Sequence, residues 1–170
     1  MALLRVIIKR NSLTVCGDID LEIRLRPIGF VRSKFTKDRG DARKIISEIV
    51  LFEELGEALT GIEGYSHLLV LFWMDKIRRG GRRIREMHPW GKEELPLVGV
   101  FATRAPLRPN PIGLAPVELV ERCDNILRVR GLDAWDGTPV IDIKPYDHWD
   151  RIDGIRVPEW WTKTKPKIRK

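Results

Sequence analysis

The sequence of 170 residues contains little cysteine: only Cys16 and Cys123, neither with a close partner such as a CxxC pair. A disulfide framework or a zinc site built on paired cysteines is therefore not expected, and the pattern is typical of the reducing cytoplasm. Long apolar runs are also lacking. The apolar stretch at residues 3–8 is short, is interrupted by Arg5 and is followed directly by Lys9 and Arg10. It predicts neither a signal peptide nor a spanning helix. We accordingly expect a cytoplasmic protein with no membrane partner and no metal.

Two further patterns are missing. No internal repeat is present, and no glycine-rich strand-to-helix turn marks a Rossmann-type nucleotide site. What the chain does contain is 43% hydrophobic residues and six tryptophans. This much apolar surface can offset the entropy of ordering the chain, and the length suits a single globular domain.

Positive charge exceeds negative charge. Thirty-one Lys and Arg against 24 Asp and Glu give a net charge of +7 and a pI near 9.7. One dense group consists of Lys76, Arg78, Arg79, Arg82, Arg83, Arg85 and Lys92, and residues 151–170 hold a second. Both groups are equally well explained as solvated surface of a charge-rich protein or as contacts with nucleic acid.

Many short strands with few helical periods are indicated. Residues 20–26 alternate cleanly between apolar and charged side chains, as a half-buried strand requires. Further strands are expected at 46–51, 68–73, 98–103, 117–120, 127–129 and 140–143, with a helical turn at 53–59. The 68–73 run is apolar on both faces and could also be helical, although a central strand is favoured. The pattern predicts a mainly β protein, namely a small antiparallel β-barrel with short helices and loops.

Three regions are predicted. Residues 1–19 form an N-terminal extension, interpreted as a hairpin turning at 10–12, and residues 20–152 form the barrel domain. Residues 153–170 form a basic tail. Trp160 and Trp161 are expected to anchor this tail onto the domain, leaving the lysine-rich end mobile.

One candidate ligand segment is rich in proline. Residues 100–114 read Val-Phe-Ala-Thr-Arg-Ala-Pro-Leu-Arg-Pro-Asn-Pro-Ile-Gly-Leu. Prolines fix φ and remove backbone donors, so this loop is expected to be stiff. A stiff loop places Arg104, Arg108 and Asn110 with little entropy left to lose on binding a ligand.

A second candidate segment is the turn Asp136-Gly137-Thr138-Pro139, which precedes the strand at 140–143. From these residues alone, a simple hairpin turn is the favoured interpretation.

Together the two segments resemble the TsaA-like family, also called TrmO or YaeB. The resemblance covers most of the chain, from Pro-Ile-Gly at 27–29 through residues 61–68 and the proline loop to Lys-Pro-Tyr at 144–146. It implies a small antiparallel barrel, usually a homodimer, that holds S-adenosylmethionine in loops at one end. It also implies methylation of N6 of N6-threonylcarbamoyladenosine at position 37 of tRNA, beside the anticodon.

Carried onto matching positions, the resemblance implies cofactor contacts in four places: Ala42, Arg43 and Lys44; His67 and Leu68; Arg104 and Leu114; and Asp136, Gly137, Thr138 and Pro139. Relatives carry Pro-Arg-Gln at the first place, so only the arginine is kept there. S-adenosylmethionine has a carboxylate, which an arginine can bind bidentately, and a flat adenine, which apolar side chains can sandwich. As alternatives, His67, Leu68 and Leu114 are ordinary core residues.

Methyl transfer needs positioning of the reacting atoms and, for an amide-like nitrogen, removal of a proton. Asp136 is the preferred candidate base, with Asp142 and His67 as alternatives. For tRNA, Arg82, Arg83 and Arg85 are expected to contact phosphates and Trp90 to stack on a base. Two other interpretations stay open: a non-catalytic barrel that binds the cofactor or RNA, and a methyltransferase with a different acceptor.

Overall fold

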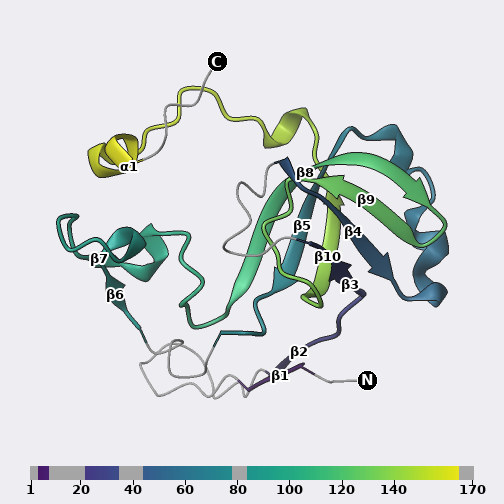
Figure 1. The fold of residues 1–170 in the computed structure, drawn as a ribbon, viewed down its shortest axis with the longest axis horizontal. Coiled ribbons are helices and arrows are strands. Elements are labelled where there is room, and N and C mark those ends of the chain that lie inside the picture. The colour runs from purple at the N-terminus through teal and green to yellow at the C-terminus, as the bar shows by residue number, and fades with distance from the viewer. Residues whose placement is uncertain (1–3, 8–21, 35–43, 78–83, 165–170) are drawn as a thin grey trace, which may run out of the picture.

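The barrel predicted from the sequence is present. The computed structural model describes residues 4–7, 22–34, 44–77 and 84–164 (Figure 1). Six strands close in the order β10-β3-β4-β9-β8-β5, and every neighbouring pair is antiparallel. Their bounds are β3 (Gly29–Arg32), β4 (Ile46–Leu51), β5 (His67–Trp73), β8 (Ile112–Cys123), β9 (Ile126–Arg130) and β10 (Pro139–Pro145). Closure leaves no complete edge strand in the barrel.

The barrel interior is filled by alternate residues of these strands. Ile49, Leu68, Val70, Leu127 and Val129 have no exposed surface and belong to one hydrophobic cluster. Successive side chains of a strand point to opposite faces, so these residues point inward and their neighbours point outward. The run at 68–73 is thus a strand, as favoured, and its outward residues Leu69 and Leu71 are half-buried, whereas Trp73 at its end is buried.

The first strands differ from the prediction. β2 (Glu22–Leu25) pairs with β1 (Leu4–Ile7) in a separate two-stranded sheet, so the strand expected at 20–26 is not part of the barrel. The expected turn at 10–12 lies outside the described residues. The barrel begins instead at Gly29, the first residue of β3. A Cβ on Gly29 would lie 2.3 Å from the carbonyl oxygen of Val50, so the glycine permits close strand pairing.

The strand expected at 98–103 is wrong beyond its second residue. β7 (Val98–Gly99) pairs with β6 (Glu86–Met87), and the chain then enters the 3-10 helix η6 (Val100–Ala102). The other expected strands lie within β4, β8, β9 and β10, and η2 (Glu53–Leu59) occupies the expected helical turn. Short helices η3 (Ile62–Gly64), η5 (Pro89–Gly91) and η7 (His148–Asp150) complete the connections.

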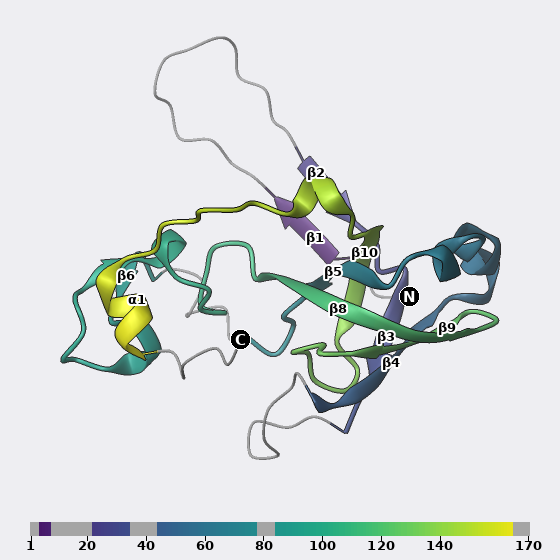
Figure 2. The same cartoon turned by 90° about the horizontal axis from the view of Figure 1, so that it is seen from above.

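A small unit stands apart from the barrel, as Figures 1 and 2 show. β6, η5, β7 and η6 lie between β5 and β8 in the sequence, and the helix α1 (Glu159–Thr164) lies beside them. The ring of Trp90 contacts two tryptophans of α1: its centroid lies 5.9 Å from that of Trp160 and 5.5 Å from that of Trp161. The predicted tail is therefore anchored by its tryptophans, but through a helix and onto this outer unit. Within the described ranges, no helix is long and apolar enough to cross a membrane.

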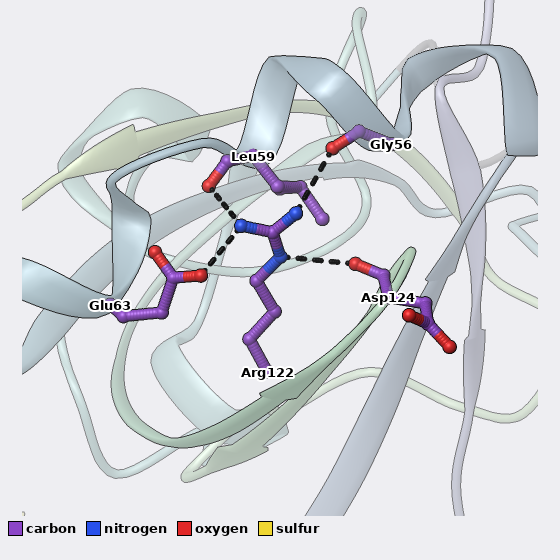
Figure 3. A network of polar contacts seen from close by, with 5 residues as sticks. All are labelled: Gly56, Leu59, Glu63, Arg122 and Asp124. Atoms are coloured by element: carbon purple, nitrogen blue, oxygen red, sulfur yellow. Dashed lines mark hydrogen bonds and ion pairs between the residues drawn. The ribbon is translucent and has the colours of Figure 1, made fainter.

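At the end of β8, one arginine ties several segments together (Figure 3). The Arg122 guanidinium donates to the carbonyl oxygens of Gly56 at 3.3 Å, Leu59 at 3.1 Å and Asp124 at 3.0 Å. It also pairs with the Glu63 carboxylate at 2.5 Å. The backbone amide of Glu63 and then the guanidinium hold the pKa of that carboxyl below its ordinary value. The Arg122 guanidinium thus links η2 and η3 to the β8–β9 hairpin.

Candidate functional site

The Asp136 turn is fixed by the end of β3. Gly137 has φ +76° and Thr138 N–H donates to the Trp135 carbonyl at 3.1 Å, as in a turn with glycine at its third position. Gly137 N–H donates to the Val31 carbonyl at 2.8 Å. The Ser33 amide donates to Asp136 Oδ1 at 3.0 Å. The predicted Asp-Gly turn is thus present, and its carboxylate lies beside the loop that follows β3.

Lys76 joins this turn to the segment that follows β5. Its Nζ donates to the Asp136 carbonyl oxygen at 2.9 Å and lies 5.5 Å from the Trp135 ring centroid. Two positions earlier, the Met74 amide donates to the Pro111 carbonyl oxygen at 2.8 Å. The end of β5 therefore contacts both the Asp136 turn and the last proline of the proline loop. We call this the Asp136 end of the barrel.

The proline loop is held by short-range hydrogen bonds. The Thr103 hydroxyl donates to the Val100 carbonyl at 2.8 Å and accepts from the Ala105 amide at 3.2 Å. Arg108 Nη1 donates to the Ala105 carbonyl at 3.2 Å. Arg104 Nη2 reaches across to the Leu114 carbonyl oxygen of β8 at 2.9 Å. The loop is thus closed onto itself and onto the strand that follows it.

The first half of β8 pairs on one side only, which explains why a side chain can reach Leu114. Residues 112–117 pair with β5, and β9 joins β8 only from Glu118 onward. Pro116, which has no N–H to offer a partner strand, lies in this one-sided stretch. On the side of β8 that pairs with β5, glycine is needed at position 113, because a Cβ there would lie 2.2 Å from the Phe72 ring.

Arg104 and Asp136 lie on opposite flanks of the same part of β5. Leu114, which Arg104 contacts, is paired with Leu71. On the other side of β5, Val140 of β10 is paired with Phe72, and the Asp136 turn directly precedes β10. The proline loop and the Asp-Gly turn are therefore brought to the same end of the barrel.

Ser33, which directly follows β3, also belongs to this end, and the described residues of the chain between β3 and β4 resume at Lys44. Lys44 is exposed and lies just before β4, and its neighbour Ile45 accepts a hydrogen bond from the Gly131 amide at 3.2 Å. Ser33, at the start of this loop, bonds to Asp136 and to the Ser47 hydroxyl at 2.7 Å. The predicted contacts Ala42 and Arg43 lie outside the described residues.

The structure does not bring His67 and Leu68 to this end. They start β5, whereas the Asp136 end lies beyond its last residue, about 20 Å away for a strand of this length. His67 Nδ1 lies 2.9 Å from the Ser66 hydroxyl, and its ring packs edge-on against Tyr146. Leu68 is 0% exposed and packs in the core. Their assignment to the cofactor stays a prediction.

Sequence reasoning missed three residues at the Asp136 end: Ser33, Lys76 and Trp135. Lys76 had been grouped with the basic cluster, yet it contacts a residue 60 positions away. Nothing in its sequence neighbourhood distinguishes it from the other cations. The exposure of Trp135, directly before the Asp-Gly motif, is likewise seen only in the folded chain.

The other candidates are placed as follows. Asp142 is half-buried in β10, accepts from the Ile143 amide at 2.9 Å and pairs with Lys144 at 2.8 Å. Of the predicted RNA contacts, Arg85 and Trp90 are exposed in the outer unit, whereas Arg82 and Arg83 lie outside the described residues. Among the described residues, no three His, Cys, Asp or Glu side chains are gathered in a way that could hold a metal ion.

The geometry defines a class of protein: a closed six-stranded antiparallel barrel that gathers the proline loop and the Asp136 turn at one end of β5. The model of the tRNA-methyltransferase O N-terminal domain matches residues 31–153. This chain therefore belongs to the tRNA-methyltransferase O family, which confirms the resemblance noted in the sequence.

Individual relatives agree with this assignment. A probable S-adenosyl-L-methionine-binding protein of Methanothermobacter thermautotrophicus is 51% identical over 142 residues, which is 80% of this chain and 97% of that protein. The tRNA (adenine(37)-N6)-methyltransferase of Escherichia coli is 45% identical over 96 residues, which is 53% of this chain and 40% of that enzyme. The crystal structure of TrmO from Pseudomonas aeruginosa has a TM-score of 0.61 and 33% identity, and the match covers 78% of this chain. This chain spans about 60% of the length of that TrmO chain.

Proposed function

We propose that this protein is a cytoplasmic S-adenosylmethionine-dependent methyltransferase of tRNA, and that its acceptor is N6 of N6-threonylcarbamoyladenosine at position 37. The observation that carries the proposal is the family match over residues 31–153, which includes all four predicted cofactor segments. The name of the Escherichia coli relative supports an acceptor at adenine 37. The name of the Methanothermobacter relative supports S-adenosylmethionine as the methyl donor.

The residues at the Asp136 end fit this cofactor. Arg104 has five N–H groups, of which one bonds to the Leu114 carbonyl, so the guanidinium retains donors for a carboxylate. Leu114 is 49% exposed and Trp135 is also exposed, which offers apolar surface to a flat base. When bound, S-adenosylmethionine supplies an activated methyl group. The chain's own task is then to orient the acceptor nitrogen and to take its proton.

We assign Asp136 as the base that accepts the proton from the acceptor nitrogen. Its Oδ1 is fixed by the Ser33 amide, so the second oxygen keeps a constant direction. The bound donor would supply the methyl group to the nitrogen, and the electron pair of its carbon–sulfur bond would leave with the sulfur. The proton on nitrogen passes to the Asp136 carboxylate.

The Asp136→Asn variant tests this role, because an amide oxygen can still accept from Ser33 but an amide is no base. We expect calorimetric S-adenosylmethionine affinity to be kept and methyl incorporation into tRNA to fall by roughly 100-fold or more, as for loss of a general base. Arg104→Ala should instead weaken cofactor affinity. Arg128→Ala, on the exposed outer wall, serves as the matched arginine control. Unchanged turnover by Asp136→Asn would remove Asp136 from the mechanism.

The acceptor is tested by nucleoside mass spectrometry. tRNA from cells with and without the gene should differ by one methyl group on N6-threonylcarbamoyladenosine. A methyl difference on another nucleoside would assign a different acceptor. Identical tRNA nucleosides, with a protein that still consumes S-adenosylmethionine in vitro, would assign a small-molecule acceptor.

A second candidate function is cofactor binding without catalysis. The observation that favours it is coverage: the relative matched over 97% of its length is named only as a probable binding protein, whereas the named methyltransferase is matched over 40%. The two candidates separate in one assay. Calorimetric binding of S-adenosylmethionine with no methyl incorporation into tRNA favours the second.

We also propose that the protein forms a homodimer through the outer wall of β5 and β8. Leu69 and Leu71 point outward, opposite Pro116 and Leu114, so this wall is apolar where a barrel surface is normally polar. Light scattering should give a dimer, and Leu69→Lys with Leu71→Lys should give a monomer. Phe30→Lys, an exposed apolar residue on β3, is the control. A wild-type monomer would refute the dimer.

Binding of tRNA through the basic segment has its own readout. Replacing Arg82, Arg83 and Arg85 with Ala should weaken tRNA binding and flatten its dependence on salt, because each lost phosphate contact lowers the slope by about one. Cofactor affinity should stay the same. An unchanged salt slope would count against this surface.

A further inference from the structure

Trp90 occupies an unusual backbone position. Its φ is +55° and that of Gly91 is +69°, and the Lys92 amide donates to the Pro89 carbonyl at 3.1 Å. These are features of a type I′ turn, whose central positions are normally Gly, Asn or Asp. A bulky L-residue is disfavoured there because its Cβ crowds the backbone. A tryptophan at this position therefore persists only because its surroundings hold it.

The surroundings are two tryptophans of the C-terminal helix. The Trp90 ring lies 5.9 Å from that of Trp160 and 5.5 Å from that of Trp161, and the latter two are 5.7 Å apart. His88, just before the turn, bonds through Nδ1 to the Leu95 carbonyl at 2.7 Å. The helix rings are half-buried by these contacts, whereas Trp90 remains 53% exposed. The turn thus presents Trp90 partly to solvent, while the rings of Trp160 and Trp161 contact it.

A second aromatic ring and two cations accompany it. Phe101 of η6 is 76% exposed, and its neighbour Val100 donates to the Arg85 carbonyl at 2.8 Å, so Phe101 and Arg85 are close in the backbone. Arg85 and Lys92 are both exposed, and the latter lies 3.8 Å from Glu94. Two exposed rings and two exposed cations within one small unit suit a ligand with flat bases and anionic linkers, which describes single-stranded nucleic acid.

We propose that unpaired RNA bases stack on Trp90 and Phe101, with Arg85 and Lys92 on the adjoining phosphates, and that α1 is a positioning element for Trp90. The proposal rests on the proposed function in so far as RNA is the substrate, and it adds Phe101, Trp160 and Trp161 to the interface. Stacking is largely independent of base identity, so this surface supplies affinity for unpaired nucleotides rather than sequence readout.

The test compares a fluorescein-labelled single-stranded oligouridylate with a duplex RNA of equal length, by anisotropy and tryptophan quenching. We expect Trp90→Gly to weaken oligouridylate binding roughly 5- to 100-fold, the range of one lost base–aromatic stack. Glycine accepts the φ of this turn, so the backbone should be kept. Trp90→Phe should lose less because it retains an aromatic face. Trp149→Ala removes an 84% exposed tryptophan outside the cluster and should change nothing.

Phe101→Ala keeps the proposal testable if Trp90 variants fold poorly. Phe101 is so exposed that its removal should leave the melting temperature unchanged while weakening oligouridylate binding over the same range. Wild-type affinity in this variant and in Trp90→Gly would overturn the proposal. Equal binding of duplex RNA without quenching would do the same, since it indicates phosphate contacts alone.

The remaining outcomes separate this proposal from the others. If Trp90→Gly changes light scattering from dimer to monomer without affecting RNA, the surface contacts a second copy and the proposal fails. Calorimetry with S-adenosylmethionine on each variant should give wild-type affinity. If no variant and no wild-type protein binds the cofactor, yet oligouridylate binding still depends on Trp90, the proposed methyltransferase function fails while the stacking surface stands.

Discussion

Replacing Arg122 with Met tests how much one side chain contributes to the fold. The methionine keeps much of the aliphatic volume but removes the three bonds to the carbonyls of Gly56, Leu59 and Asp124. Each such bond contributes about 0.5–1.5 kcal/mol net, and the half-exposed ion pair with Glu63 adds little. We therefore expect a loss of about 2–4 kcal/mol in the free energy of unfolding.

Urea denaturation followed by tryptophan fluorescence measures this loss, and calorimetry should show a melting temperature lower by roughly 4–16 °C for a chain of this size. Arg122→Lys should recover little, since one ammonium cannot reach several carbonyls in a planar fork. The matched control is Arg128→Met, which removes an exposed pair with Glu121 and should cost about 0–1 kcal/mol. If the Arg122 and Arg128 variants lose the same stability, the network in Figure 3 does not hold the fold.

Three further outcomes are expected. The pKa of Glu63 is lowered by its own backbone amide and by the Arg122 guanidinium, so the ionised carboxylate stabilises the fold above its ordinary pKa of 4.5. This stabilisation is lost as the pH falls through the lower pKa of the folded state. The free energy of unfolding should therefore fall less steeply with acid in Glu63→Gln than in the wild type. Gly113→Ala should cost about 1–3 kcal/mol in urea denaturation, because its Cβ would overlap the Phe72 ring, and a wild-type midpoint would contradict this. The Glu121 carboxylate raises the pKa of the Cys123 thiol, so alkylation of the Cys123 peptide by iodoacetamide at pH 8 should be faster in Glu121→Gln, and an equal rate would argue against the contact.

Much of the barrel was predictable because its strands carry their own pattern. Alternation places Ile49 inside, and the apolar run of β5 gave a central strand. Two errors have a common cause: tertiary context overrode the local signal. Gly29 resembles a strand breaker but permits close approach of β4, and residues 100–102 have strand-forming side chains yet turn into η6 because only the short β6 is there to pair with.

The candidate site was predictable as motifs but not as a place. The proline loop and the Asp-Gly turn are recognisable in the sequence, and they meet at the Asp136 end. His67 and Leu68 were grouped with them by position in the motif, although a whole strand separates them from that end. Lys76 and Trp135 became visible only once the chain was folded, because their contact joins distant parts of the sequence.

The hydrogen bond between Met74 and Pro111 has a consequence for how the molecule can change. β5 and β8 would form an ordinary hairpin if everything between Met74 and Pro111 were removed, because all of β5 is already paired with residues 112–118 of β8. The outer unit is therefore an insertion between two paired strands, and the Met74–Pro111 hydrogen bond closes the base of that insertion. It can lengthen, shorten or unfold without unravelling the wall beneath it, and hydrogen exchange should show its amides opening well before those of β5.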